Sequence, residues 1–336
     1  MKILAIESSC DETSAAVVED GRRILSCKIL SQIDIHRRFG GVVPEVASRA
    51  HIEAVVPLTN EALSEAGLSL SDIDAVAVTY RPGLIGALLV GVNFAKSLAY
   101  ATNKPIIAVN HIRGHVAANY LAHPDLKPPF LALVISGGHT SLLYVKDYTE
   151  YETIGITRDD AAGEAFDKVA RVMGIDYPGG AEMDRLARLG DASLINFPRA
   201  SVKDAHYDFS YSGLKTAVVN HLHKLSQNGT DFKKEDIAAS FTEAVCDTIT
   251  DRLSHAIRDF NPPCVVLAGG VSANSHIREA VSALCEKNKC KLYLPPLSLC
   301  GDNAAMISSQ AFYEFSHNNV SDIHLNAIAV SDKFVN

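Results

Sequence analysis

The sequence predicts an α/β protein built from two related lobes. One observation is a strand-turn-strand pattern that occurs twice, in residues 3–20 and again in residues 131–147. Each copy has an apolar run, a short polar turn and a second apolar run, which is typical of a β-hairpin. A second observation is the length of 336 residues, which exceeds what one hydrophobic core usually supports. The third is an alternation of strand-like and helix-like segments, which favours a largely parallel sheet in each lobe with helices packed on it.

The elements of the first lobe are expected in the order βββαβα. The hairpin supplies the first two strands, and its polar turn contains Asp11. The spacing of apolar residues and the turn signals then predict a third strand, a long amphipathic helix, a buried strand, a second helix and a short strand. Their ranges are 24–31, 44–66, 75–79, 82–102 and 106–109.

The second lobe is expected to repeat this order from residue 130, with large helical insertions between Asp159 and Phe260. After the hairpin we expect a strand near 151–154, helices from Ala161 and Ile237, a strand at 265–268, a helix from Ser275 and a strand at 291–294. The segment HPDLKPP at 123–129 is the best candidate boundary. The predicted lobes are therefore 1–126 with about 304–336, and 127–303.

The composition is that of a cytoplasmic protein with no membrane segment. Seven cysteines occur without a CxxC pair, which indicates reduced thiols. The longest apolar candidate, 84–95, is interrupted by Asn93 and is far shorter than a membrane span, and Glu7 follows too short an apolar run for a signal peptide.

The formal charge of −8 argues against autonomous binding of nucleic acid, because contacts to phosphate supply most of that affinity. A nucleic-acid substrate would need a local basic patch or a basic partner. Candidate patches are Arg37-Arg38, Lys203 and Lys233-Lys234, although each is more often a solvated face.

Two histidines and a carboxylate are candidate metal ligands. In HIRGH, His111 and His115 are four residues apart, so they lie on one face of a helix and can chelate one metal. Asp302 stands just before a helix of small residues. The alternatives are a pair of polar caps for the histidines and a helix N-cap for Asp302. Two imidazoles and one carboxylate leave positions open for a substrate and favour iron or zinc over calcium.

The two hairpin turns and two glycine-containing segments are candidates for binding a nucleotide. The turns of the two hairpins, the second at Gly137-Gly138, can grip a phosphate with backbone N–H groups. The segment 265–274 runs from a buried strand through two glycines to Asn274, which suits a nucleoside or, alternatively, a helix cap. In the segment 159–187, Asp167 is expected on a helix, and Asp184 is expected to begin the next helix. Both carboxylates could bind the hydroxyls of a ribose. The alternative is that they are ordinary surface charges.

Taken in order, the motifs resemble those of the bacterial TsaD family, the catalytic subunits that make threonylcarbamoyladenosine in tRNA. The resemblance covers nearly the whole chain. It rests on IESSCDET, FGGVVPEVASRAH, PGLIGALLVG, the HxxxH, SGGHTS, DDAAGEAFDKVA, YPGG, FSYSGLKT, AGGVSAN and CGDNAAM.

This resemblance implies a two-lobed fold of the actin, sugar kinase and Hsp70 type. It implies that His111, His115 and Asp302 hold one divalent metal, iron or else zinc. Asp11 and Glu12 would lie beside the reacting group as catalytic residues. The implied contacts with the adenylate substrate are Val134, Ile135, Ser136, Gly137, Gly138, His139, Asp167, Gly180, Asp184 and Asn274.

The implied reaction moves a threonylcarbamoyl group from threonylcarbamoyl-AMP to the N6 amine of adenosine 37, in tRNAs that read codons beginning with A, and releases AMP. ATP or ADP would fit the same site. The implied partners are tRNA, a TsaB-type paralogue and a TsaE-type ATPase, with no membrane. We further expect Asp11 to accept the proton of the amine, and His139 to contact phosphate instead of serving as a third histidine ligand.

The sequence departs from the family pattern at four positions. Arg81 stands where a Gly is usual, Arg113 replaces a Glu inside the HxxxH, Ala181 replaces a Pro and Gly301 replaces a Thr. None of these changes removes an implied ligand. Arg113 is expected either to place a positive charge near the metal or to face tRNA or a partner.

Two other functions are alternatives. A metal-dependent glycoprotease would use the paired histidines, but a zincin needs Glu after the first His, and Ile112 stands there. An ATP-binding scaffold or ATPase of the same fold would turn over ATP without tRNA.

Overall fold

The structure is a computed structural model that describes residues 1–199 and 205–330, so Lys203 lies outside the described residues. The chain divides into two compact units. The first contains Met1–Pro128, Lys146–Tyr151 and the chain from Pro295 onward, and the second contains Pro129–Val145 and Glu152–Leu294. The second unit thus ends before Pro295 and not at the expected residue 303. Asp302 consequently belongs to the same unit as the two candidate histidines.

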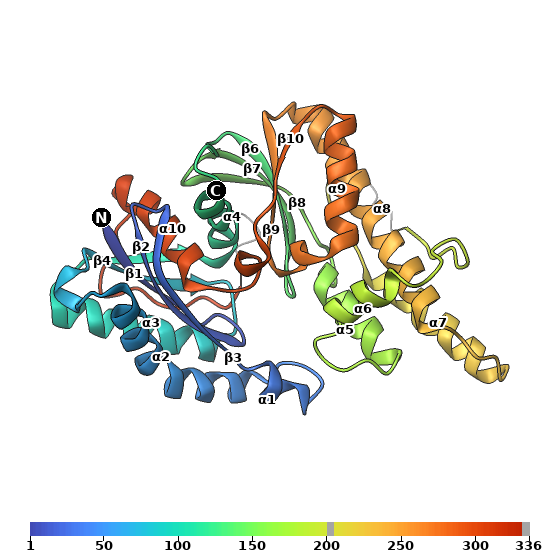
Figure 1. Ribbon diagram of the computed structural model, residues 1–336, viewed down its shortest axis with the longest axis horizontal. Helices are drawn as coiled ribbons and strands as arrows, with labels where there is room; N and C mark the ends of the chain where they lie inside the picture. The colour runs from blue at the N-terminus through green and yellow to red at the C-terminus, as the bar shows by residue number, and fades with distance from the viewer. Residues whose placement is uncertain (200–204, 331–336) are drawn as a thin grey trace. The chain divides into compact units, whose positions relative to one another are not determined.

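The first unit contains a five-stranded sheet in the order β3-β2-β1-β4-β5 (Figure 1). The hairpin is confirmed, because β1 runs antiparallel to β2 and β2 antiparallel to β3. Only the pairs β1-β4 and β4-β5 are parallel, so the expectation of a largely parallel sheet is wrong. Tight turns join the first three strands, and such turns reverse the chain direction. The strands are β1 (Lys2–Glu7), β2 (Glu12–Glu19), β3 (Arg23–Ser31), β4 (Ala75–Arg81) and β5 (Ile106–Asn110).

The second unit repeats this arrangement. Its sheet has the order β10-β9-β6-β7-β8, in which β6 pairs antiparallel with β7 and parallel with β9, as β1 does with β2 and β4. The doubled hairpin of the sequence is therefore part of a doubled sheet. The strands are β6 (Phe130–Ile135), β7 (Thr140–Asp147), β8 (Glu150–Ile156), β9 (Cys264–Ala268) and β10 (Lys291–Tyr293).

Helices cover both faces of the first sheet. Val55 and Leu88, from α2 and α3, pack with Ile6 on one face, while Ile3 packs on the other face with Met306 from α10. The faces differ because successive strand side chains point to opposite sides. The helices of this unit are α1 (Ile33–Arg37), α2 (Pro44–Ala66), η1 (Leu70–Asp72), α3 (Ile85–Thr102), α4 (His111–Ala122), η3 (Leu297–Leu299) and α10 (Ala304–Ser316).

Of the described helices, α3 is the one long and apolar enough to cross a membrane. Its residues Ala87, Leu88, Val92 and Ala95 are buried, and they pack in the core against the first sheet. The core helix of a folded unit can have the same composition as a membrane span, and 33% of this helix is buried.

The expected helical insertion lies between β8 and β9 and shares one core with the second sheet. The helices of this unit are α5 (Ala162–Val172), α6 (Gly180–Ala187), α7 (Ser212–Gln227), α8 (Lys234–Phe260), η2 (Gly270–Ala273) and α9 (Ser275–Lys287). One local expectation is wrong: α6 begins at Gly180, so Asp184 lies inside the helix and does not start it.

Candidate metal centre

Two capped helix ends bring the candidate ligands together. The side chain of Asn110 accepts hydrogen bonds from the N–H groups of Ile112 and Arg113, so α4 starts directly at His111 after β5. Asn303, not Asp302, caps α10, because its side chain accepts from the N–H of Met306. The N-cap alternative for Asp302 is therefore wrong, and its carboxylate is directed toward α4 instead.

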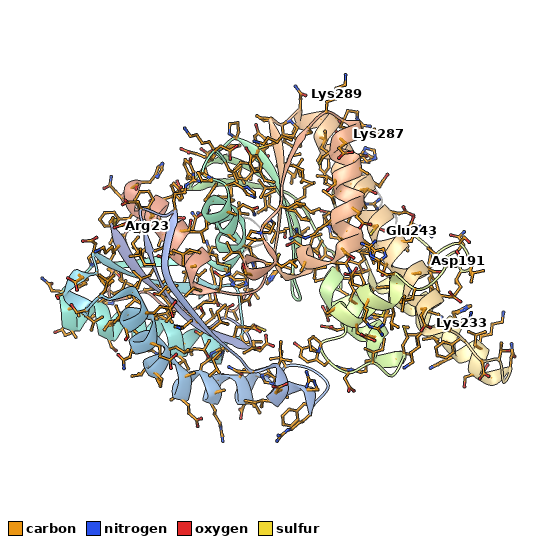
Figure 2. The ribbon with its side chains drawn as sticks, in the orientation of Figure 1. Arg23, Asp191, Lys233, Glu243, Lys287 and Lys289 are labelled. Atoms are coloured by element: carbon orange, nitrogen blue, oxygen red, sulfur yellow. The ribbon has the colours of Figure 1, made fainter. Side chains whose placement is uncertain are left out.

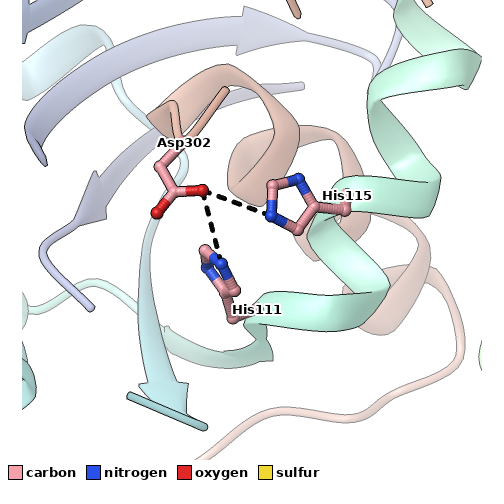
Figure 3. A group of neighbouring side chains, drawn as sticks. All are labelled: His111, His115 and Asp302. Atoms are coloured by element: carbon pink, nitrogen blue, oxygen red, sulfur yellow. Dashed lines mark ion pairs between the residues drawn. The ribbon is translucent and has the colours of Figure 1, made fainter. Parts of the chain in front are cut away.

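The three side chains converge on one point (Figure 3). The Oδ1 atom of Asp302 lies 3.5 Å from Nε2 of His111 and 3.2 Å from Nε2 of His115. One potential ligand atom from each residue lies within 4.8 Å of the others. Gly114 allows α4 to approach α10, since a Cβ there would lie 2.6 Å from the end of the Ile307 side chain. The spacing of His111 and His115 along α4 thus gives two of the candidate ligands, and Asp302, far away in the sequence, gives the third.

The donor set fits a divalent metal. His115 is fully buried, and neither of its ring nitrogens makes a hydrogen bond within residues 1–199 and 205–330. A buried polar atom without a partner costs about 1–3 kcal/mol. Nε2 of His115 lies 3.2 Å from Oδ1 of Asp302 without hydrogen-bond geometry, and a metal bound by the two Nε2 atoms and Asp302 would satisfy it. Two imidazoles and a carboxylate are donors typical of iron and zinc, while calcium takes oxygen ligands.

The metal-free site carries unequal histidines. Burial would lower the pKa of His111, but the carboxylates of Asp302 and Glu7 outweigh it and raise the pKa to about 9. Burial lowers the pKa of His115, and the nearby charge of His111 lowers it further. The site therefore already favours one positive charge, which a metal cation would supply in place of the proton on His111.

Glu7 is a component that the sequence analysis missed. It ends β1 and is fully buried, with Oε2 3.1 Å from Nδ1 of His111. The hydroxyl of Thr79 donates to the same oxygen at 2.6 Å, and the N–H of Ser9 donates to Oε1 at 2.6 Å. Burial would raise the pKa of Glu7, but the charge and hydrogen bond of His111 outweigh it and lower the pKa. Its signal in the sequence was a carboxylate at the end of an otherwise apolar strand.

Asp11 and Glu12 lie at the turn between β1 and β2, as expected. Asp11 is buried, and Glu12 accepts a hydrogen bond from the hydroxyl of Ser31 at 3.0 Å. Burial, followed by the charges of Asp302 and Asp11, raises the pKa of Glu12 to about 9. The turn therefore places acidic groups close enough to the metal centre for their charges to act on one another.

His51 supports this turn from α2 and was also missed. Its ring is fully buried, with Nε2 2.9 Å from the carbonyl of Cys10 and Nδ1 2.7 Å from the hydroxyl of Thr13. A carbonyl only accepts, so Nε2 carries the proton and Nδ1 accepts from Thr13. The hydrogen bonds of this single histidine hold both ends of the Asp11-Glu12 segment. His51 is the last residue of the motif FGGVVPEVASRAH, and nothing in that motif indicated this role.

The expected substrate contacts lie in the second unit, and several converge around the turn between β6 and β7. Ser136 exchanges hydrogen bonds with His139 across the turn, and the space beside Gly137 and Gly138 is open. A Cβ at Gly163 would lie 2.7 Å from the carbonyl oxygen of Ser136, so the start of α5 packs beneath this turn. Val134 and Ile135 are the buried end of β6.

The remaining contacts connect α5, α6 and α9. Asp167 accepts from the N–H of Gly179, immediately before Gly180. Asp184 accepts from the N–H and hydroxyl of Ser275 and lies 2.8 Å from Nδ1 of His276. Asn274 caps α9, because its side chain accepts a hydrogen bond from the N–H of Ile277. The alternative of a helix cap for this residue is therefore confirmed. Asp184 is thus an interior helix contact and not merely surface charge.

Arg113 pairs with a carboxylate of α10. Its guanidinium lies 3.2 Å from Glu314 and 4.8 Å from the centre of the Tyr151 ring. The side chain is 19% exposed, and the expectation that it contacts tRNA or a partner stays a prediction. Arg81 lies over Tyr80, and a side chain at Gly301 would meet open space.

Solved structures of low sequence identity share the fold. HypF of T. kodakarensis aligns with a TM-score of 0.66 at 14% identity over 95% of this chain and 48% of that chain. Component A of the (R)-2-hydroxyglutaryl-CoA dehydratase of Acidaminococcus fermentans gives a TM-score of 0.57 at 16% identity, over 94% of this chain and 99% of that chain. The expected fold of the sugar kinase type is confirmed.

Closer relatives identify the family. Proteins named tRNA N6-adenosine threonylcarbamoyltransferase from Clostridium botulinum (strain 657 / Type Ba4) and Clostridium novyi (strain NT) are 53% and 54% identical to this chain. Each alignment covers 98% of this chain and 96% of the relative. A model of the TsaD family, described as tRNA N6-adenosine threonylcarbamoyltransferase, matches residues 23–309. The chain belongs to the TsaD family of tRNA N6-adenosine threonylcarbamoyltransferases.

Proposed function

We propose that this transferase attaches a threonylcarbamoyl group to the N6 amine of adenosine in tRNA, with a metal held by His111, His115 and Asp302. The observation that carries the proposal is the convergence of these three residues in a chain that belongs to the TsaD family. The buried His115 supports the presence of a metal, because its Nε2 faces Asp302 at 3.2 Å without making a regular hydrogen bond. Iron is proposed first and zinc second, since both suit imidazole and carboxylate ligands.

The proposed donor is threonylcarbamoyl-AMP, and the acceptor is adenosine 37 of tRNAs that read codons beginning with A. A bond forms between N6 of adenine and the carbamoyl carbon, and the bond from that carbon to the phosphate oxygen breaks. AMP leaves with the electron pair, and the amine loses one proton. ATP or ADP is proposed to fit the adenylate site, since the nucleotide part is shared.

The roles of the side chains follow from their chemistry. The metal, when bound, supplies a Lewis acid for the carbamoyl oxygen. Asp11 accepts the proton of the amine, directly or through a water, and the neutral Glu12 beside it keeps like charge off the site. The N–H groups of Gly137 and Gly138, in their open turn, donate to the departing phosphate. His139 contacts the same phosphate and is not a metal ligand.

The adenosine part of the donor is proposed to contact the second unit. Asp167 and Asp184 would receive ribose hydroxyls, and Gly180 allows close approach because nothing fills the space beside it. Asn274 uses its side-chain oxygen to cap α9, so its NH₂ group is the part proposed to bind the nucleotide.

The acidic chain is proposed to act with partners in the cytoplasm. Lys287 and Lys289 lie close together at the end of α9, while Lys233 precedes α8 elsewhere on the second unit (Figure 2). With a net charge of −8, so few lysines give little affinity for tRNA, because that affinity depends on several phosphate contacts. A TsaB-type paralogue and a TsaE-type ATPase are the proposed partners.

One experiment tests the function. Nucleosides from tRNA of a depletion strain are measured by mass spectrometry, with and without plasmid copies of the wild type, His111→Ala and the control His324→Ala. His324 is exposed and lies outside the proposed site. Depletion should remove threonylcarbamoyladenosine, and only the wild type and control should restore it. Unchanged modification on depletion would overturn the assignment.

A second experiment tests the role of Asp11. Asp11→Ala should lose transfer in the purified system while adenylate binding, measured by calorimetry, survives. For His139→Ala, unchanged metal content with weaker AMP binding is expected. Loss of metal from that variant would make His139 a ligand.

A further inference from the structure

The two ring nitrogens of His111 face different groups. Its Nε2 faces Asp302 at 3.5 Å, while its Nδ1 lies 3.1 Å from Oε2 of Glu7 and 3.2 Å from the hydroxyl of Ser9. Glu7, Ser9 and His111 are all buried, with exposed fractions of 0%, 2% and 5%. The contacts on the Nδ1 side are therefore sheltered from water.

Glu7 can serve only as an acceptor in this setting. The Ser9 N–H donates to Oε1 and the Thr79 hydroxyl donates to Oε2, so each carboxylate oxygen already faces a donor. A carboxylate with these partners requires a proton on the imidazole nitrogen that approaches it. When a metal displaces the proton from Nε2, the proton that remains on His111 sits on Nδ1, and the lone pair of Nε2 faces the point where the three ligands converge.

We propose that Glu7 is a positioning residue, which fixes His111 as the Nδ1–H tautomer so that its Nε2 binds the metal. A carboxylate in this place also makes the imidazole a stronger ligand. His115 offers a contrast within the same site, since its Nδ1 makes no hydrogen bond in the described part of the chain. His111 is therefore the histidine whose orientation is set from behind, by the end of β1. The inference rests on the metal centre of the proposed function.

The substitution Glu7→Gln gives a sharp test because the amide has only one oxygen. If its NH₂ replaces Oε1, it meets the N–H of Ser9, which cannot accept. If its NH₂ replaces Oε2, it donates to Nδ1 of His111 and moves the ring proton to Nε2, where it blocks the metal. Either orientation of the amide weakens the site, so metal affinity is expected to fall about 10–100-fold.

Co²⁺ is the probe, and its absorption spectrum reports both affinity and ligand set in the full-length protein. The series is wild type, Glu7→Gln, His111→Ala, Asp302→Ala and the control Ser71→Ala, an exposed serine of η1. Glu7→Gln should bind Co²⁺ weakly, and the two ligand variants should lose the spectrum. Binding within twofold of the wild type in Glu7→Gln would overturn the role of Glu7. Full binding in His111→Ala and Asp302→Ala would overturn the metal centre itself.

A measurement on the unmodified protein covers the case in which Glu7→Gln does not fold. Nitrogen-15 spectra of the histidine rings of the Zn²⁺-loaded protein distinguish a protonated nitrogen from one bound to metal. His111 should show a proton on Nδ1 and zinc on Nε2. Zinc on Nδ1 would contradict the proposal, whatever the variant does.

Discussion

Asp302 and Asn303 are adjacent residues with different tasks. Both side chains can cap a helix, but Asn303 accepts from the N–H of Met306 and thereby starts α10. Asp302 lies before the helix with Oδ1 directed toward two histidines. Because Asn303 caps α10, the carboxylate of Asp302 is left to act as a candidate metal ligand.

Substitutions at these two positions should separate stability from metal binding. Asn303→Ala removes the cap and is expected to lower the free energy of unfolding by about 1 kcal/mol, while the ligands remain. Asp302→Ala should abolish metal uptake, whatever the loss of its ion pairs with the two histidines does to the stability of the metal-free protein. Urea unfolding without metal and elemental analysis after loading measure the two effects. A loss of metal in Asn303→Ala equal to that in Asp302→Ala would show that the cap also places the ligand.

His51 should make the stability of the protein depend on pH. Burial lowers its pKa below the ordinary 6.5, against the raising effects of the Cys10 carbonyl, Glu7 and Asp11, and the charge of His36 lowers it too. In the unfolded chain the ring titrates normally, so the unfolded state binds more protons as the pH falls. The contribution is full above pH 6.5 and is lost below it, by up to about 1.4 kcal/mol at pH 5.5.

The comparison of wild type with His51→Gln isolates this effect. Urea unfolding at pH 7.5 and pH 5.5 should give a smaller difference between the two pH values for the variant. The other titratable groups remain in both proteins, so their contributions cancel. An equal pH dependence in both proteins would assign the titration to another group.

At the scale of elements, the start of α5 and the turn between β6 and β7 depend on each other. Gly163 is the second residue of α5, and a Cβ there would lie 2.7 Å from a backbone oxygen and 2.8 Å from the Cα of Gly137. Backbone atoms cannot rotate away as the end of a side chain can. The position of this turn is therefore tied to the absence of a side chain on α5.

Gly163→Ala should consequently displace the turn that is proposed to hold phosphate. We expect a loss of about 1–3 kcal/mol in the free energy of unfolding, the usual cost of overpacking, and weaker binding of AMP. The matched control is Gly213→Ala, because Gly213 is also the second residue of a helix and has open space beside it. Calorimetry with AMP and urea unfolding measure both effects. AMP binding at wild-type strength in Gly163→Ala would show that the turn has another role.

The elements themselves were largely predictable because their signals are local. The strand expected at 24–31 is Arg23–Ser31, and the helix expected at 44–66 is Pro44–Ala66. The spacing of His111 and His115 likewise showed that they share a helix face. The two hairpins were predicted, but the parallel share of each sheet was overestimated, because alternation of strands and helices does not show how many strands a hairpin adds to the sheet.

The tertiary partners of the site were less predictable. In the sequence, Glu7 is only a carboxylate at the end of a strand. Its role depends on contact with His111, which lies far along the chain. The return of the chain to the first unit was predicted for α10 but placed at about residue 304 instead of Pro295, because residues 295–303 carry no local signal of the unit that they join. Arg113 could pair with any nearby acid, and only packing brings it to Glu314 on α10.

At the scale of the whole molecule, the metal should stabilise one unit. All three candidate ligands and Glu7 belong to the first unit. A ligand at 100 times its dissociation constant stabilises the folded state by about 2.7 kcal/mol. That stabilisation should appear in the helices that carry the ligands, and hydrogen exchange followed by mass spectrometry can locate it.

Addition of Zn²⁺ should therefore slow exchange in α4 and α10 while α7 exchanges as before. Asp302→Ala should show no change with Zn²⁺ in any of these helices. Equal protection of α7 and α4 in the wild type would indicate that the stabilisation is not confined to the first unit.

The return of the chain to the first unit at Pro295 also sets an order of events during synthesis. The segment Met1–Pro128 carries both histidines and all five strands of the first sheet, but α10 covers one face of that sheet and follows Asp302. A ribosome therefore releases two metal ligands and an uncovered apolar face long before the third ligand and the covering helix. The second unit must be made in between. Stable metal loading thus reports that the polypeptide has been translated past residue 302.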